Sequence, residues 1–430
     1  MTHPLNQLDD LARREFITRM AKTSLGVSLV PPAMLARAVE TSAPKFAGHI
    51  IYLYMRGGMS HLDTFDTKPD APAGYQGSTR TIKTKSPDLQ ISGFFPKLAE
   101  HGDKLAVVRS MHHTQGAHEP GMYKVLTGYE VSPSVRHPAL GSWVARQVTQ
   151  GASTLPSYIR LADLSGHPGA GFMDARYAPV PVLDPSKGLE HTQLQQGDSM
   201  ANLRKRTGLA DKLNTDFLKR YPMAEVKAHA DVFADAIKLM TSKDLDAFDI
   251  TKEKGSLIND YGANYFGQGV LLARRLVERG CKFVEIELGG WDTHSNNFAT
   301  VETLSKAVDD AVATLLEDLE ARGLLETTLV VLTTEFGRSP KLKGLGRDHH
   351  PIAFSSFIAG GGVKGGQAYG KTDETGTRIV ENPVTVLDFH ATIGKLMGVS
   401  PHDLIPGAGG SFNIYGGTGA KRGVPIPAFV

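Results

Sequence analysis

The sequence lacks paired cysteines, long apolar runs and a strong excess of charge. Its single cysteine, Cys281, excludes an internal disulfide framework and a zinc cage of cysteines. Because Cys281 opens an apolar run, we interpret it as a core residue. The formal net charge of +2 gives no electrostatic reason to expect a nucleic acid as partner. After the N-terminus no segment offers the roughly 18 consecutive apolar residues of a membrane-spanning helix, so we expect none.

The N-terminal residues are typical of a twin-arginine export signal. The pair Arg13 and Arg14 is followed by a weakly apolar stretch from Leu25 to Leu35 and then by a small-x-small cleavage site ending at Ala38. This order predicts a signal peptide over residues 1–38, the twin-arginine export machinery as a partner, and a periplasmic or secreted location. The alternative is an ordinary amphipathic helix with a chance arginine pair.

Apolar strands alternate with amphipathic helices through most of the remaining chain. The predicted strands are His49–Met55, Leu105–Arg109, Lys282–Leu288, Thr328–Thr333 and Ile352–Ala359. The predicted helices are Tyr123–Leu126, Ala139–Val148, Asp260–Arg279, Leu304–Arg322 and Val386–Met397. This alternation indicates βαβ units, and therefore an α/β fold with a mostly parallel central sheet covered by helices on both faces.

The composition divides the chain into three parts. After the signal peptide, residues 45–402 form the expected α/β domain, with a charged helical insert at about 201–250. Residues 403–430 are rich in glycine and proline, and we expect them to wrap the surface as an extended tail.

Polar residues gather in four loops at the ends of predicted strands. These loops are Gly57–Asp63, His112–Gly121, Gly289–Asn296 and Glu335–Pro351. Ligands of open α/β sheets bind at the carboxyl ends of the strands, and His, Asp and Glu suit divalent metals. Asp292 and His294 are two residues apart, so an extended loop would point both side chains toward one ion. We expect a metal or substrate role for His294, His349 and His350, and interpret His3, His101, His191 and His229 as ordinary solvated or hydrogen-bonded residues.

Three segments resemble parts of sulfatases and occur in the same order as in that family. They are Tyr123–Gly128, the helix and strand from Val308 to Gly337, and Val386–Ile393. On these residues the chain is identified as a member of the alkaline phosphatase superfamily, which implies a three-layer α/β/α sandwich of the alkaline phosphatase type. It more narrowly resembles a twin-arginine-exported, sulfatase-like family of unknown function common in planctomycetes. The segments of that likeness are Gly57–His61, Gly290–His294, Glu335–Arg338 and Asp348–Pro351.

The sequence also departs from the sulfatase pattern. His118 stands where sulfatases carry the cysteine that becomes formylglycine, so we expect no formylglycine. Gly57 and Gly58 replace the aspartate expected after the first strand, and Glu335 and Phe336 replace a metal-binding Asp-His pair. A histidine at position 118 can be a nucleophile, a metal ligand or a general base, and the sequence does not choose among them.

The resemblance implies metal-dependent hydrolysis of a phosphate or sulfate ester, with a small molecule or a polysaccharide as substrate and zinc, calcium or manganese as metal. In this interpretation the first metal site consists of Asp292, His294 and His349 or His350. Glu335 serves a second metal or orients ligands. His118 is the nucleophile or base, with Ser60 as the other candidate, and Arg338 clamps anionic oxygens. The alternative is a non-catalytic protein that kept the fold and binds an anionic polysaccharide.

Overall fold

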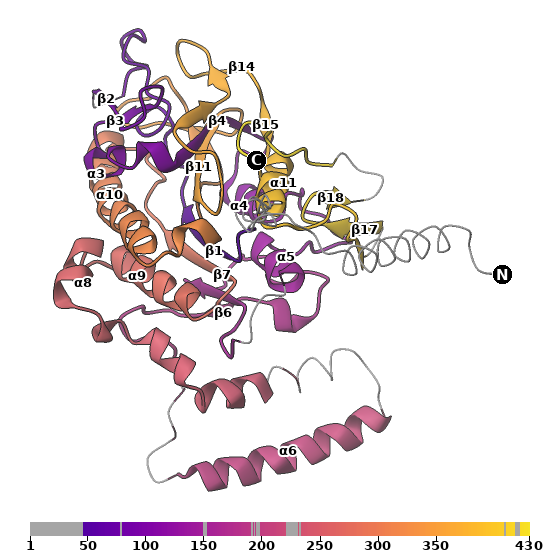
Figure 1. Ribbon diagram of the computed structural model, residues 1–430. Helices are drawn as coiled ribbons and strands as arrows, with labels where there is room; N and C mark the ends of the chain where they lie inside the picture. Colours follow the sequence, from indigo (N-terminus) through magenta and orange to yellow (C-terminus); the bar gives the residue numbers. More distant parts are fainter. Residues whose placement is uncertain are drawn as a thin grey trace, which may run out of the picture. The chain divides into compact units, whose positions relative to one another are not determined.

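A nine-stranded sheet is the largest element of the computed structural model (Figure 1). The structure describes residues 46–430 except 78–79, 149–152, 191, 193, 195–197, 221–230, 232–233, 408–409 and 418–421. The signal peptide expected over residues 1–38 therefore lies outside the described residues. The strand order is β12-β4-β11-β8-β1-β7-β5-β6, and β15 pairs with β4. The strands are β1 (His49–Met55), β4 (Leu105–His112), β5 (Tyr158–Leu161), β6 (Val180–Pro181), β7 (Phe283–Leu288), β8 (Thr328–Thr333), β11 (Phe354–Gly360), β12 (Gln367–Tyr369) and β15 (Val384–Thr385).

Alternate side chains of the strands enter two separate apolar layers. In β1, Ile51 and Leu53 belong to one cluster, whereas Ile50 and Tyr52 belong to the other. The first cluster includes residues of α3 (Pro96–Ala99), α8 (Gly255–Tyr261), α9 (Tyr265–Glu278) and α10 (Asn297–Ala321). The second includes residues of α4 (His118–Thr127), α5 (Leu140–Gln147) and α11 (Val386–Leu396). The two sets of helices cover opposite faces of the sheet (Figure 1), which confirms the predicted three-layer sandwich.

Strand direction in this sheet has one exception. Strand β11 is antiparallel to both of its neighbours, β4 and β8, whereas the other pairings are parallel. The predicted mostly parallel sheet is therefore confirmed. Because β11 runs the opposite way, it begins at the edge where β1, β4, β7 and β8 end, with Phe354 paired to Met111. The residues just before β11 consequently reach the same edge as the loops that follow the parallel strands.

Three helices differ from the sequence-based expectation. Helix α4 begins at His118, five residues before the predicted Tyr123, so His118 lies on a helix and not in the preceding loop. The single helix predicted over Asp260–Arg279 is two helices, because α8 ends at Gly262 with a φ of 98° and Asn264 caps the start of α9 through the Gly267 amide. Helix α10 begins at Asn297, before the predicted Leu304, and its first turns already place Val301 in the core, three residues before Leu304. No helix among the described residues is long and apolar enough to cross a membrane.

The remaining elements are short or lie outside the large sheet. The charged segment expected to be helical contains α6 (Met200–Arg220) and a 3-10 turn at Lys243–Phe248. Four small sheets pair β2 (Thr81–Lys83) with β3 (Gln90–Ser92), β9 (Gly337–Arg338) with β10 (His349–His350), β13 (Lys371–Thr372) with β14 (Ile379–Glu381), and β16 (Ile405–Gly407) with β17 (Gly410–Asn413) and β18 (Gly416–Gly417). Residues after 402 also add Ile414, Tyr415 and Phe429 to the second apolar layer.

Candidate metal centre

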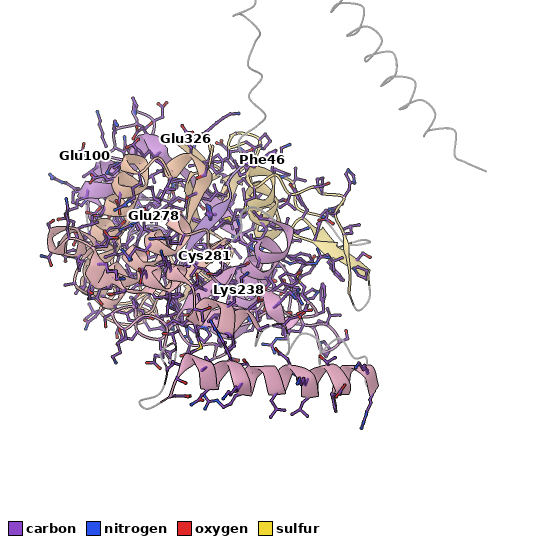
Figure 2. The ribbon with its side chains drawn as sticks, turned by 60° about the horizontal axis from the view of Figure 1, so that its bottom comes forward. Phe46, Glu100, Lys238, Glu278, Cys281 and Glu326 are labelled. Carbon is purple, nitrogen blue, oxygen red and sulfur yellow. The ribbon has the colours of Figure 1, made fainter. Side chains whose placement is uncertain are left out.

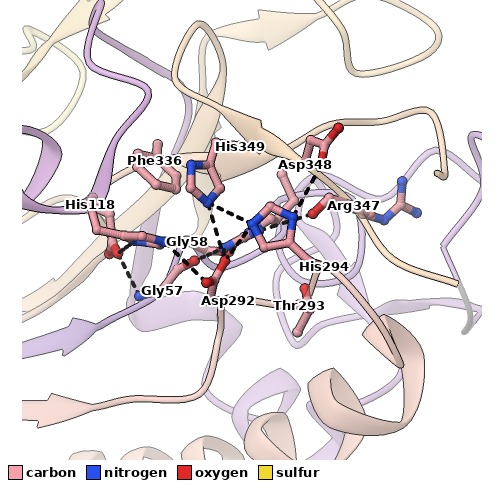
Figure 3. A network of polar contacts seen from close by, with 12 residues as sticks. Gly57, Gly58, His118, Asp292, Thr293, His294, Phe336, Arg347, Asp348 and His349 are labelled. Carbon is pink, nitrogen blue, oxygen red and sulfur yellow. Dashed lines mark hydrogen bonds and ion pairs between the residues drawn. The ribbon is translucent and has the colours of Figure 1, made fainter. Parts of the chain in front are cut away.

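Four elements bring polar side chains together at the edge where the parallel strands end. His118 is the first residue of α4, after β4, while Asp292 and His294 lie between β7 and α10. Glu335 follows β8, and His349 lies in β10, immediately before β11. Figure 3 shows His118, His294 and His349 around the Asp292 carboxylate. The predicted convergence of these residues is what the sheet topology produces.

Gly57 lets the loop that carries Asp292 approach the end of β1. Its φ is +120°, and a Cβ there would lie 2.4 Å from the Asp292 amide nitrogen. The Trp291 amide donates to the Arg56 carbonyl at 3.2 Å, which ties the loop to the strand end. Only glycine accommodates both the backbone conformation and the close contact.

The donor atoms are spaced as the ligands of one metal ion are. Asp292 Oδ1 lies 3.1 Å from His294 Nε2 and 3.3 Å from His349 Nε2, and the two ring nitrogens are 3.1 Å apart. Asp292 Oδ2 lies 3.3 Å from His118 Nε2. Four donors at roughly 2.0–2.1 Å from one tetrahedral ion would be about 3.3 Å from each other. His118, Asp292 and His349 each offer a donor atom within 4.8 Å of the others.

Each of the three histidines is held by its other ring nitrogen. His118 Nδ1 is 2.9 Å from Glu335 Oε1, His294 Nδ1 is 3.2 Å from Asp348 Oδ1, and His349 Nδ1 is 2.7 Å from the Gly116 carbonyl. Carboxylates and a carbonyl oxygen accept hydrogen bonds, so each Nδ1 carries a proton, and in the neutral form of each ring the lone pair on Nε2 faces Asp292. Metal-binding histidines are typically oriented in this way.

The arrangement therefore fits a divalent ion. The Nε2 atoms of His294 and His349 lie 3.1 Å apart, and a divalent cation would accept the lone pairs of both. The buried Nε2 of His118 makes no hydrogen bond, although Asp292 Oδ2 lies 3.3 Å from it. His118, Asp292, His294 and His349 would hold the ion, and three imidazoles with one carboxylate suit zinc better than calcium.

Glu335 orients His118 through the hydrogen bond to its Nδ1. The carboxylate is fully buried, and its Oε1 also accepts the Gly57 amide at 2.6 Å. The hydrogen bond from His118 to Glu335 raises the pKa of the imidazole above its ordinary value. The sequence-based expectation allowed Glu335 either to serve a second metal or to orient ligands, and its contacts correspond to the second of these tasks.

Arg338 holds Asp292 in place. Burial of Asp292 disfavours ionisation, but the hydrogen bond and the charge of Arg338 outweigh burial and lower the carboxyl pKa to about 2. Nη2 of Arg338 lies 2.5 Å from Asp292 Oδ1 and also donates to the Gly57 carbonyl. Nε donates to the Gly58 carbonyl at 2.9 Å, and Nη1 donates to the Arg347 carbonyl at 3.0 Å. The expectation that Arg338 clamps substrate oxygens is corrected, because its guanidinium is fully buried and bonded to the protein.

Two other predicted residues lie outside the cluster. Ser60 is buried and donates to Asp63 Oδ2 at 2.6 Å, so its hydroxyl is committed to another network. His350 directs Nε2 to the Thr377 carbonyl at 2.9 Å and stacks on His61. Successive residues of a strand face opposite sides, so His349 enters the cluster and His350 does not.

The sequence did not indicate three further residues that shape the site. The Phe336 ring lies against His349 at a centroid distance of 4.5 Å and against His118 at 5.2 Å. Asp348 and the Gly116 carbonyl hold His294 and His349. Asp348 stands next to His349 in the sequence, and carboxylates commonly support metal-binding histidines, so that proximity was the available signal.

Cys281 is remote from this cluster. It lies just before β7, whereas Asp292 follows the other end of that strand, and six strand residues span roughly 20 Å. The thiol of Cys281, which is labelled in Figure 2, is buried, and burial raises its pKa to about 12. The interpretation of Cys281 as a core residue is confirmed.

Among the solved structures that are similar to this chain are two sulfatases and an alkaline phosphatase. A sulfatase from Pseudoalteromonas sp. is 12% identical with a TM-score of 0.38, over 84% of this chain and 69% of that one. A putative sulfatase from Bacteroides thetaiotaomicron is 10% identical with a TM-score of 0.39, over 83% and 72%. The alkaline phosphatase from the Antarctic bacterium TAB5 is 13% identical with a TM-score of 0.36, over 83% and 100%. Likenesses of this size say nothing about activity.

Comparison of sequences identifies a family but no activity. No curated protein matches the chain significantly. Residues 47–421 match the family model described as "Protein of unknown function (DUF1501)", which covers nearly all of the chain after the predicted signal peptide. The chain belongs to this family of proteins of unknown function.

Proposed function

We propose that this protein is an exported, metal-dependent hydrolase of a phosphate or sulfate ester. The observation that carries the proposal is the facing pair His294 Nε2 and His349 Nε2, 3.1 Å apart beside Asp292, with each Nδ1 committed to an acceptor. A shared divalent cation would accept the lone pairs of both rings. A bound divalent ion supplies polarisation of an ester oxygen and activation of the attacking group.

The chain's own residues prepare the site for this chemistry. Glu335 keeps the proton of His118 on Nδ1, so that the Nε2 lone pair faces the cluster. That lone pair can bind the ion or accept a proton from the attacking group. Phe336 packs against two of the imidazoles and covers one side of the cluster, which limits the access of water there. Asp292, held by Arg338, stays ionised.

Metal analysis of a matched pair of variants tests the proposal. Exported protein is dialysed without chelator, and its zinc, manganese and calcium are counted by plasma mass spectrometry. We expect bound metal in the natural protein and in His350→Gln, and loss of metal in His349→Gln, because only His349 faces the cluster. Release of p-nitrophenol from p-nitrophenyl phosphate or sulfate should follow the metal content. Metal-free natural protein would reject the proposal.

A different result would favour the non-catalytic alternative. That alternative predicts binding of a sulfated polysaccharide without hydrolysis of either ester, whether or not metal is present. Both ester assays and a polysaccharide binding assay should therefore be run on the same metal-loaded sample.

A further inference from the structure

Four oxygen atoms converge on the buried guanidinium of Arg338. They are the Asp292 carboxylate oxygen and the carbonyl oxygens of Gly57, Gly58 and Arg347. One carboxylate and several carbonyls are ligands that a hard cation takes from a protein. The guanidinium thus lies in surroundings of the kind that a second metal ion would occupy, directly beside Asp292.

The backbone at the end of β1 is shaped to present these oxygens. Gly57 and Gly58 have φ values of +120° and +92°. Other residues adopt such conformations at a cost, so two consecutive glycines allow both carbonyls to face Arg338. A Cβ on Gly58 would lie 3.0 Å from Arg338 Nε, which shows how closely the backbone encloses the side chain.

In the natural protein Arg338 engages the oxygens around it, and the carboxylate of Glu335 is engaged by other groups. Glu335 Oε1 accepts the Gly57 amide and His118 Nδ1, and Oε2 accepts the Thr334 hydroxyl at 3.3 Å. Within the part of the chain that the structure describes, a single group of side chains has mutual donor distances within 4.8 Å, and it consists of His118, Asp292 and His349. His294 is outside that group, although its Nε2 lies 3.1 Å from Asp292 Oδ1 and from His349 Nε2.

We propose that the site takes one divalent ion and that Arg338 supplies, as a fixed part of the chain, the positive charge of a second cation. The inference rests on the proposed metal-dependent function and specifies its metal requirement. Together with one divalent ion, Arg338 leaves a single positive charge over Asp292 and Glu335, because Lys343 offsets Asp348 at 3.1 Å. This net positive charge favours binding of an anionic ester, and no second metal ion is required for it.

Metal counting and electron paramagnetic resonance test the number of ions. Chelator-treated protein is reloaded with Mn²⁺ and desalted, and manganese per chain is measured by plasma mass spectrometry. We expect one Mn²⁺ and the spectrum of an isolated ion. Two ions per chain with the spectrum of a magnetically coupled pair would overturn this inference and leave the proposed function standing. No bound ion would reject the proposed function itself.

Two variants of Arg338 test its part in the arrangement. Arg338→Ala removes the charge and opens the oxygen-lined position, so we expect bound Mn²⁺ to rise from one to two per chain. Arg338→Lys retains a positive charge and should still bind one. Circular dichroism checks that each variant folds. One Mn²⁺ in folded Arg338→Ala would overturn the role assigned to Arg338. If that variant does not fold, the count in the natural protein still decides the number of ions.

Discussion

Gly57 has no side chain, and this lets the loop that carries Asp292 pack directly against the backbone at position 57. Its Cβ would lie 2.4 Å from the Asp292 amide nitrogen, and this atom belongs to backbone that cannot easily move. The position of the Asp292 carboxylate therefore depends on the residue at position 57, although the two are far apart in the sequence.

Gly57→Ala should displace the loop that carries Asp292. We expect the free energy of unfolding to fall by about 1–3 kcal/mol and metal affinity to fall with it, since overpacking forces the backbone apart. Urea denaturation and competition with a chromogenic chelator measure the two effects. Gly289→Ala in the same loop is the control, because a Cβ there meets nothing within 4 Å. Equal metal affinity in both variants would contradict this account.

His390 makes stability depend on pH away from the cluster. It is 1% exposed, its Nε2 donates to the Val125 carbonyl at 2.9 Å, and burial lowers its pKa to about 4. In the unfolded chain a histidine has a pKa of about 6.5. Between these values the unfolded state binds the proton and the folded state does not, so stability falls as the pH falls from 6.5 toward 4.

This difference predicts a loss of about 2 kcal/mol from His390 between pH 7.5 and pH 5. His390→Gln keeps a donor but cannot titrate. It should be less stable than the natural protein at pH 7.5, yet lose about 2 kcal/mol less on going to pH 5. Chemical denaturation at both pH values provides the comparison, and an unchanged pH dependence in the variant would count against the assignment.

Among the elements, helix α10 supports its neighbour α3 through one buried carboxylate. Asp309 accepts the backbone amides of Lys97 at 3.1 Å and Leu98 at 2.7 Å. These are amides of the first turn of α3, which have no partner within the helix itself. A side chain on one helix thus completes the start of another.

Asp309→Ala should lower the free energy of unfolding by about 1–2 kcal/mol, as loss of a helix cap does. Asp310→Ala is the matched control. Asp310 pairs with Lys97 and Lys306, whose side chains are 56% and 78% exposed, so its removal should cost about 0–1 kcal/mol. Urea titration of both variants measures the fall in the free energy of unfolding. An equal fall in Asp309→Ala and Asp310→Ala would show that the hydrogen bonds from Asp309 to α3 add no stability beyond that of a surface ion pair.

How far the sequence predicts these elements depends on the signal each carries. Strands β1 and β8 have the predicted limits because continuous apolar runs end abruptly at polar loops. The break at Gly262 was missed, since apolar residues continue on both sides of it. The choice between His349 and His350 needed the register of β10, which pairs His349 with Arg338 and cannot be inferred from composition.

The sequence predicts which residues gather in the cluster, but not the role that each of them has there. Polar loops at strand ends identified Asp292 and His294 because parallel strands end at one edge. Burial decided the task of Arg338, and nothing in the local sequence indicates that its guanidinium is enclosed. Long-range contacts of this kind appear only when the chain has folded.

For the whole molecule, the export proposal can be tested independently of the metal. Changing Arg13 and Arg14 together to Lys should leave uncleaved protein in the cytoplasm, because the twin-arginine pair is the recognised element. Immunoblots of cell fractions and intact mass measure location and cleavage after Ala38. A control variant with Lys45→Arg, beyond the predicted signal, should be processed normally. Normal processing of the double variant would refute the proposed route.

The antiparallel strand β11 has a consequence for the order in which the protein is made. It lies between β4, which leads to His118, and β8, and it pairs with both. A chain released from the ribosome at residue 353 would contain every metal donor, yet nothing would join β4 to β8. Asp292, His294 and His349 can already meet at that point, because β7 and β8 both pair with β1. His118 joins them only when Phe354–Gly360 enters the sheet, so metal bound with His118 as a ligand would report that β11 is in place.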